Sequence, residues 1–177
     1  SFHPVKTITT GEGGLVTTNN SKIDKKIKML RSLGIKRKFN THWKYDVVLK
    51  GFNFRLNDFQ CALGISQLSQ INKFLKKRET IASFYNKNLG KISEIIIPEN
   101  NRNYKSSNHL YIINLKNFNE DNKDKFIKYM KKNKVMVQFH YIPIYKFSIF
   151  KKNLNLKQTE KYFNSAISLP IFYDLKL

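Results

Sequence analysis

A lysine, Lys6, stands where an apolar run meets a glycine-rich turn, and its amine could do covalent chemistry. Residues 1–14 read SFHPVKTITTGEGG. Glycines allow the backbone to take positive φ and to approach another group closely. A lysine at the mouth of such a turn can act as a point charge, a Schiff-base former or a proton carrier. The alternative, common in a lysine-rich chain, is a turn followed by one more exposed lysine.

A second stretch with chemical potential is GFNFRLNDFQCALGISQL at residues 51–68. Asn53 and Arg55 point the same way if this run is extended, because side chains alternate along a strand. An amide beside a guanidinium suits an anionic oxygen. The alternative is that Arg55 pairs with an acidic side chain, either Asp58 or Glu79.

The third candidate is the run 135–141, which alternates apolar and polar side chains and ends before Pro143. This period of two predicts a strand with Gln138 and His140 together on one face. A lone histidine in such a position is usually structural. With Gln138 beside it and Tyr141 after it, the pair is a better candidate for a polar binding wall.

The elements that must position these groups alternate between helices and strands. Hydrophobic periodicity and punctuation by glycine and proline predict helices over 21–33, 57–68, 71–89 and 121–133, and a last one before an ISLPIF strand. Strands are predicted at 15–18, 95–97, 106–113 and 135–141, and residues 35–50, with His42 and Trp43, are predicted to be an irregular loop.

Capping residues sharpen three of these boundaries. Ser21 is predicted to cap the first helix and Gly34 to end it. Asn57 and Gln60 have the spacing of a capping box at the start of the second helix.

The composition is that of a globular protein and argues against membrane-spanning, secreted and metal-binding classes. The chain has 177 residues, 41% of them hydrophobic, which suits one domain or a small pair. It has no apolar run that could span a membrane, no secretory signal and no metal-ligand spacing. The single cysteine, Cys61, cannot form an internal disulfide, which fits a reducing cytoplasm.

The net charge of +21 raises the possibility of a nucleic-acid partner. The lysines are nevertheless spread along the chain, and no RNP, zinc-finger or helix-turn-helix pattern accompanies them. A general bias toward Lys, Asn and Ile explains the charge about as well, so nucleic acid is not favoured as the main partner.

Three stretches together resemble one family. Residues 1–14 are similar to the lysine motif of the DegT/DnrJ/EryC1/StrS family of sugar aminotransferases that use pyridoxal phosphate. Residues 51–68 resemble the family's G-[FY]-N-[FY]-R block. Residues 106–111 and 137–145 look most similar to members that make the pseudaminic acid precursor. Because the family's lysine motif lies near the middle of a much longer chain, this sequence is expected to be a fragment.

The resemblance implies an α/β fold, the fold-type-I architecture of pyridoxal-phosphate transferases. Residues 1–70 would be the C-terminal part of the large cofactor-binding domain, 71–90 a linking helix, and 91–177 an incomplete small domain. Family members are homodimers whose active sites are shared between subunits.

The resemblance also implies the reaction. L-Glutamate gives its amino group and leaves as 2-oxoglutarate, and the C4 keto group of a UDP-linked 4-keto-6-deoxy sugar is aminated. Lys6 would hold the pyridoxal 5′-phosphate and then carry the proton, as the catalytic residue. Ser1 and Asn53 would contact the cofactor phosphate, and Asn53 would do so in the neighbouring subunit. Arg55 is a weaker candidate nearby. The sugar-nucleotide site would be lined by Ser1, Asn53, Gln138, Phe139, His140 and Tyr141.

Several family features lie outside this sequence: the aspartate that pairs with the pyridine nitrogen, a phosphate-binding turn and a ring-stacking residue. We therefore expect no transaminase activity from the 177-residue chain alone. The alternatives are a bacillosamine-type aminotransferase, a basic nucleic-acid-binding module and a non-catalytic fragment. A family dehydratase is disfavoured, because those enzymes carry another residue in place of Lys6.

Overall fold

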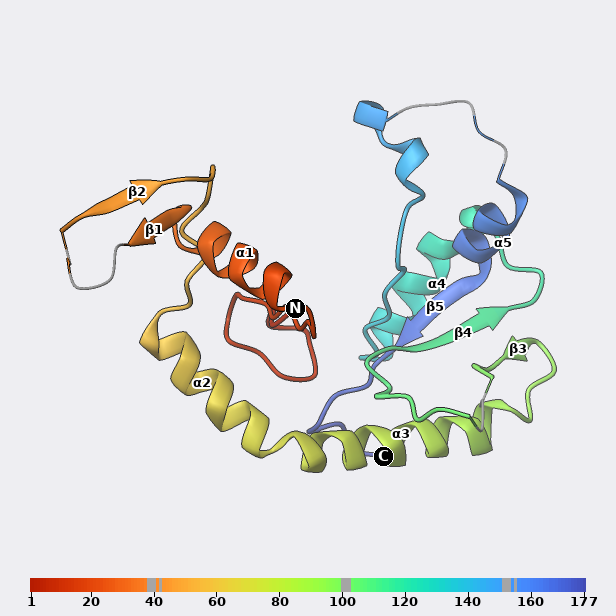
Figure 1. Cartoon of the computed structure of the whole chain (residues 1–177). Coiled ribbons are helices and arrows are strands. Elements are labelled where there is room, and N and C mark those ends of the chain that lie inside the picture. The colour runs from red at the N-terminus through yellow and green to blue at the C-terminus, as the bar shows by residue number, and fades with distance from the viewer. Residues whose placement is uncertain (38–40, 42, 100–102, 151–153, 155) are drawn as a thin grey trace. The chain divides into compact units, whose positions relative to one another are not determined.

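The computed structural model divides the chain into two compact units, Ser1–Ile71 and Asn72–Leu177 (Figure 1). It describes residues 1–37, 41, 43–99, 103–150, 154 and 156–177. The predicted His42 in the first loop lies outside the described residues. Each unit is described by itself below.

The first unit begins with an extended loop that leads into α1 (Ser21–Arg31). The prediction that Ser21 caps this helix is wrong. Asn20 has the extended backbone that a cap requires, and its Oδ1 accepts hydrogen bonds from the amides of Lys22 (2.9 Å) and Ile23 (3.2 Å). At the other end, α1 stops at Arg31 with Ser32 as its C-cap, earlier than the predicted end at Gly34. The Gly34 amide nevertheless donates to the Met29 carbonyl at 2.8 Å and so satisfies one carbonyl of the last turn.

One strand prediction and one loop prediction for this unit are wrong. Residues 15–18 form no strand, and Leu15 and Val16 are 70% and 66% exposed. The segment 35–50, predicted as a loop, contains a hairpin of β1 (Ile35–Arg37) and β2 (Tyr45–Val47). Strand formation requires a partner for the backbone groups, and composition alone does not show which segment finds one.

The second helix of this unit, α2 (Asp58–Ser69), starts as predicted. The Asn57 side chain accepts from the Gln60 amide at 2.9 Å, and the Gln60 side chain accepts from the Asn57 amide at 3.1 Å. The capping box is therefore confirmed, and it fixes where the segment that carries Asn53 turns into the helix.

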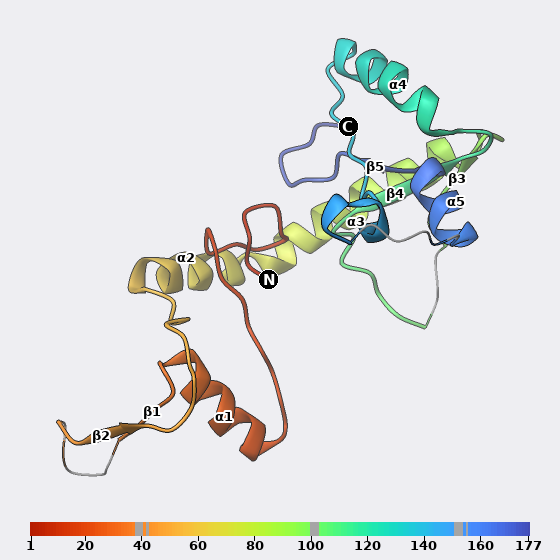
Figure 2. The ribbon, with the colours of Figure 1, turned by 90° about the horizontal axis from the view of Figure 1, so that it is seen from above.

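The second unit is built on α3 (Ile71–Leu89) and a three-stranded antiparallel sheet. The sheet order is β3-β4-β5, formed by β3 (Ile95–Ile96), β4 (Tyr111–Leu115) and β5 (Ala166–Leu169). Helix α3 packs against the sheet, α4 (Glu120–Lys132) contributes Phe126 to the same core, and α5 (Lys157–Ser165) lies beside β4 (Figures 1 and 2). Two short 3₁₀ helices, η1 (Ile144–Lys146) and η2 (Ser148–Phe150), precede α5.

The predicted strand 135–141 is reduced to one bridge. Gln138 pairs with Ser168 of β5 in antiparallel fashion, and the neighbouring residues are not part of the ladder. The alternation of burial persists from Val135 to Phe139 and then stops, because Tyr141 is 74% exposed.

The hydrophobic core belongs to the second unit. It forms where α3 meets the sheet and the segment after β5, and its buried members are Ile81, Ala82, Tyr111, Ile113, Ile167 and Ile171. The Tyr111 hydroxyl donates to the Asn86 side chain of α3 at 2.6 Å, and burial raises the pKa of Tyr111 to about 12.

The first unit has no comparable core. Among its described residues only Thr10 and Gly34 are buried. Within the part of the chain that the structure describes, no helix combines the length and the apolar character needed to cross a membrane.

Candidate active site

The segment that carries Lys6 is a closed loop. The Phe2 amide donates to the Gly13 carbonyl at 2.9 Å, and the Thr10 amide donates to the Phe2 carbonyl at 3.0 Å. Gly11 and Gly13 have φ values of +79° and +152°, which other residues adopt at a cost. The predicted glycine turn therefore folds the segment back on itself and fixes both ends of the loop.

Within this loop Lys6 ends a tight turn. Its amide donates to the His3 carbonyl at 2.9 Å, with Pro4 in the second position, where its fixed φ suits a turn. The lysine is half-buried. Its Nζ forms no hydrogen bond or ion pair with any residue that the structure describes. The backbone of Lys6 is therefore fixed by the turn, and its primary amine is left available for a ligand.

Contacts to α2 anchor the loop. The Thr10 hydroxyl donates to the Glu12 carbonyl at 2.7 Å, and the Gln60 amide group donates to the same carbonyl at 3.1 Å. Glu12 orders the loop through its backbone carbonyl, while its carboxylate lies 3.7 Å from His3 Nε2 and is mostly exposed. Thr10, which no sequence motif singles out, is only 5% exposed.

Gly64 of α2 makes room for this anchoring. A Cβ at Gly64 would lie 2.9 Å from the Thr10 Cγ2 atom. We expect Gly64→Ala to destabilise the chain by about 1 kcal/mol, since overpacking costs about 1–3 kcal/mol and the gain in helix propensity returns about 1 kcal/mol. Urea unfolding measures the difference.

The matched control for this substitution is the double variant Gly64→Ala/Thr10→Ser. It removes the threonine methyl and keeps the hydroxyl bonded to Glu12, so stability should return to at least that of Thr10→Ser alone. A Gly64→Ala chain as stable as the parent would show that the loop does not depend on this contact.

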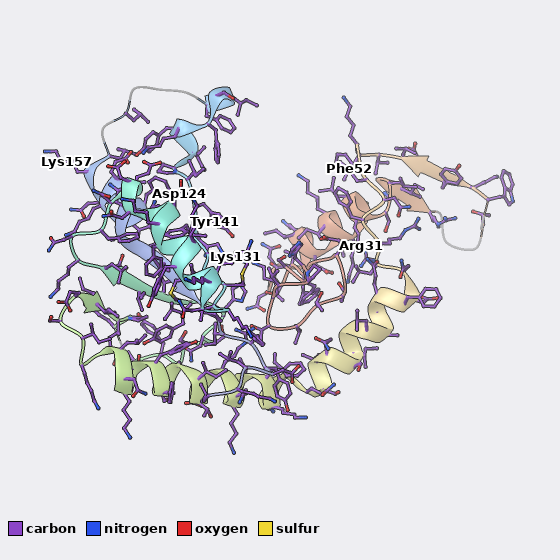
Figure 3. All side chains as sticks on the ribbon, turned by 180° about the vertical axis from the view of Figure 1, so that it is seen from behind. Arg31, Phe52, Asp124, Lys131, Tyr141 and Lys157 are labelled. Atoms are coloured by element: carbon purple, nitrogen blue, oxygen red, sulfur yellow. The ribbon has the colours of Figure 1, made fainter. Side chains whose placement is uncertain are left out.

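The segment with Asn53 lies against the end of α1. The amides of Phe52 and Phe54 donate to the carbonyls of Leu30 (2.8 Å) and Arg31 (2.9 Å), which a helix end leaves without intrahelical partners. Figure 3 labels Arg31 and Phe52 at this junction. A Cβ at Gly51 would collide with the backbone there, so glycine is what permits the approach.

Asn53 and Arg55 lie together, as the extended alternation predicts. The Arg55 Nε donates to the Asn53 Oδ1 at 2.9 Å. Arg55 forms no ion pair with Asp58, and Glu79 of the second unit lies 3.4 Å from Lys105. The Nδ2 of Asn53 has no partner among the described residues, which leaves an amide donor free.

Ser1, the other predicted phosphate contact, is exposed at the start of the Lys6 loop. Its Oγ accepts a long hydrogen bond, 3.4 Å, from the His3 amide. The first unit therefore holds three of the predicted site residues, namely Ser1, Lys6 and Asn53, on ordered segments.

The remaining predicted residues lie in the second unit. Gln138 is exposed, and its backbone exchanges two hydrogen bonds with Ser168, of 3.1 and 2.8 Å. Phe139 packs against the core, and Tyr141 projects into solvent and is labelled in Figure 3. His140 is half-buried, and its Nδ1 lies 2.7 Å from the Ser168 hydroxyl.

A cluster of charged groups supports the segment that follows Tyr141. The Glu160 carboxylate of α5 lies 2.8 Å from Lys146 and accepts a hydrogen bond from the Tyr145 hydroxyl. These contacts, Lys146 first, lower the pKa of Glu160, and the bond to Glu160 raises the pKa of Tyr145 to about 12. Lys123, 8% exposed, donates to the Phe163 carbonyl at 2.6 Å, and burial lowers its pKa.

Comparisons with known proteins show relatives that match along the whole chain. The profile of the DegT/DnrJ/EryC1/StrS aminotransferase family matches residues 1–177. The chain is 40% identical over 183 residues to a UDP-4-amino-4,6-dideoxy-N-acetyl-beta-L-altrosamine transaminase from Campylobacter jejuni, covering 100% of this chain and 47% of that protein. The Helicobacter pylori transaminase of the same name is 37% identical, and the match covers 100% of this chain and 48% of that protein.

Solved structures give the same result. Helicobacter pylori PseC, an aminotransferase involved in the biosynthesis of pseudoaminic acid, superposes with a TM-score of 0.88 at 34% identity, covering 100% of this chain and 48% of that one. The sugar aminotransferase CalS13 from Micromonospora echinospora shares the fold, with a TM-score of 0.84 at 21% identity. The superposition covers 96% of this chain and 45% of that one. The predicted fold-type-I architecture is confirmed for this portion. The chain spans about half the length of the relatives it matches.

Proposed function

Because the chain belongs to the DegT/DnrJ/EryC1/StrS aminotransferase family, we propose that it is part of an enzyme that moves an amino group from L-glutamate to a nucleotide sugar. The acceptor is the C4 keto group of a UDP-linked 4-keto-6-deoxy-N-acetylhexosamine. The products are 2-oxoglutarate and a UDP-4-amino-4,6-dideoxy sugar of pseudaminic acid biosynthesis. The observation that carries the proposal is the ordered Lys6 loop with its unpartnered amine.

The side chains of the first unit fit pyridoxal 5′-phosphate in their chemistry. Lys6 supplies a primary amine that meets no competing partner within the described part of the chain, which is what binding an aldehyde requires. Ser1 and Asn53 supply neutral donors suited to phosphate oxygens. The bound cofactor would act as the electron sink for the carbon that gains or loses a proton.

Lys6 has two tasks in this scheme. It would hold the cofactor through Nζ, and its free amine would carry a proton to and from the C4 carbon of the sugar as a general acid and base. Both tasks need the lysine in one place, and the turn from His3 together with the Thr10 anchor would fix the backbone from which the side chain extends.

Exposed aromatic side chains support a homodimer with shared sites. Phe52 and Phe54 flank Asn53 and stack on each other with centroids 4.9 Å apart, yet they are 59% and 68% exposed. Phe59 of α2 is 89% exposed. Exposed apolar surface of this kind is typical of an interface, so we propose that Asn53 reaches the cofactor phosphate of a second subunit.

The second unit would receive the sugar nucleotide. Gln138, His140 and Tyr141 offer polar groups on one segment, and Phe139 anchors that segment in the core. The net charge of +21 would favour the approach of an anionic diphosphate. The single cysteine supports a reducing, cytoplasmic setting.

A transfer assay tests this function. The full-length natural protein is incubated with pyridoxal phosphate, L-glutamate and the UDP-4-keto sugar, and mass spectrometry follows the amino sugar. We expect conversion with release of 2-oxoglutarate, and none from residues 1–177 alone. Proton coupling constants of the product separate the altrosamine configuration from the bacillosamine type. Absence of transfer by the full-length protein would refute the proposal.

A further inference from the structure

The imidazole of His140 is held by one buried hydroxyl. The Ser168 Oγ lies 2.7 Å from His140 Nδ1, and Ser168 is only 5% exposed. The same serine pairs with Gln138 through two backbone hydrogen bonds, 3.1 and 2.8 Å long. Ser168 therefore contacts both polar residues of the proposed sugar-nucleotide segment.

The register of the sheet explains why Ser168 can do this. Ser168 is opposite Ile112 of β4, while its neighbour Ile167 is opposite Ile113. Ile113 and Tyr111 share the face that packs on α3, where Tyr111 bonds Asn86. Because side chains alternate along a strand, Ser168 projects from the opposite face. Gln138 is paired with Ser168 alongside β5, so the side chain of His140, two residues further on, lies on the same face as Ser168.

The donors and acceptors available to the Ser168 hydroxyl indicate the direction of its hydrogen bond with His140. The Ser168 hydroxyl has one donor hydrogen, and His140 Nδ1 is the sole partner of Oγ among the described residues. If Nδ1 carried the proton, it would donate to Oγ, and the buried hydroxyl hydrogen would have no acceptor. Buried donors are almost always satisfied, so the hydroxyl donates and Nδ1 accepts.

We propose that Ser168 is a positioning residue that keeps His140 in the tautomer protonated at Nε2. The Nε2–H has no partner among the described residues and is then a fixed donor for an acceptor oxygen of the bound nucleotide sugar, either a sugar oxygen or a phosphate oxygen. This rests on the proposed function of the segment Gln138 to Tyr141. It adds Ser168 as the residue that makes His140 Nε2 a hydrogen-bond donor toward the substrate.

Nitrogen NMR of the chain tests the tautomer without any substrate. The chain has four histidines, so labelling with ¹⁵N-histidine gives few signals, and His140→Gln assigns one of them by its loss. At about pH 8.5, where histidine is ordinarily neutral, we expect His140 Nδ1 to show the shift of an unprotonated acceptor and Nε2 that of a protonated nitrogen.

Substitution of Ser168 completes the NMR experiment. Ser168→Ala should move both His140 nitrogen shifts toward a mixture of tautomers, and Ser168→Thr, which keeps the hydroxyl, should restore them. The signal of His3, which lies in the other unit, serves as the internal control for folding. A His140 protonated at Nδ1, or shifts unchanged in Ser168→Ala, overturns the proposal.

A double-mutant cycle tests the link to substrate in the full-length natural protein, with the UDP-4-keto sugar as probe. Ser168→Ala should raise KM about fivefold and leave kcat within about twofold, because one oriented hydrogen bond is lost. In a His140→Ala background the same change should alter KM by less than about 1.5-fold, since Ser168 acts through His140.

The outcomes separate the two proposals. An equal effect of Ser168→Ala in both backgrounds would mean a purely structural serine and would refute the positioning role. If the unsubstituted protein does not transfer an amino group at all, the proposed function fails, while the NMR arm still decides the tautomer.

Discussion

Replacing Lys6 by arginine should abolish amino transfer in the full-length natural protein, with a loss of at least about 10³-fold in kcat. Arginine keeps the positive charge and much of the length, but its guanidinium cannot take over covalent binding of an aldehyde or proton transfer. The substitution therefore separates the covalent and proton-carrying roles of Lys6 from that of a point charge. Lys6 is half-buried and its amine has no partner among the described residues, which is the reason to expect the covalent and proton-carrying roles.

Two measurements accompany this variant. The absorbance of the lysine-bound cofactor should vanish in both Lys6→Arg and Lys6→Ala, and a small primary amine added to Lys6→Ala should restore part of the turnover. Lys25→Ala is the matched control, since Lys25 is an exposed lysine of α1 in the same unit. Activity retained in Lys6→Arg would show that only the charge matters.

The second large effect concerns Arg78 of α3, which is 7% exposed. Its Nη1 donates to three backbone carbonyls: Asn108 (3.1 Å), His109 (3.1 Å) and Ile171 (2.9 Å). Burial lowers the pKa of Arg78, so these carbonyls, rather than a carboxylate, must offset the loss of hydration. The side chain thereby ties two distant segments to α3.

We expect Arg78→Met to destabilise the chain by about 2–4 kcal/mol, because the Ile171 carbonyl is left buried and the other two lose their charged donor. Urea unfolding gives the value. Lys76→Met, at an exposed lysine on the same helix, should change stability by less than about 0.5 kcal/mol. A more stable Arg78→Met chain would mean that desolvating the cation outweighs its hydrogen bonds.

Features set by neighbours in sequence were predictable. The capping box of Asn57 and Gln60, the long helix that ends at Leu89 and the pairing of Asn53 with Arg55 all depend on residue types and spacing over a short stretch of sequence. The division into domain parts at residues 70 and 90, and the roles assigned to Ser1, Lys6, Asn53 and the segment Gln138 to Tyr141, stay predictions for the experiments above.

Errors arose where a segment depends on a distant partner. Residues 15–18 have the composition of a strand but no strand beside them, whereas β1 and β2 pair with each other inside a predicted loop. The run 135–141 alternates like a strand, yet only Gln138 reaches β5. Composition reports what a segment could do, and pairing depends on which backbone lies next to it.

The sequence by itself determined the motifs that identify the family and the helices that separate them, because those depend on residue type and local spacing. Only the tertiary structure decided how the candidate side chains are held. Thr10 anchors the Lys6 loop on α2, and Ser168 bonds His140 from 28 residues away. Arg78 bonds the Ile171 carbonyl across 93 residues. Such contacts follow from strand register and chain closure, which no window of neighbouring residues contains.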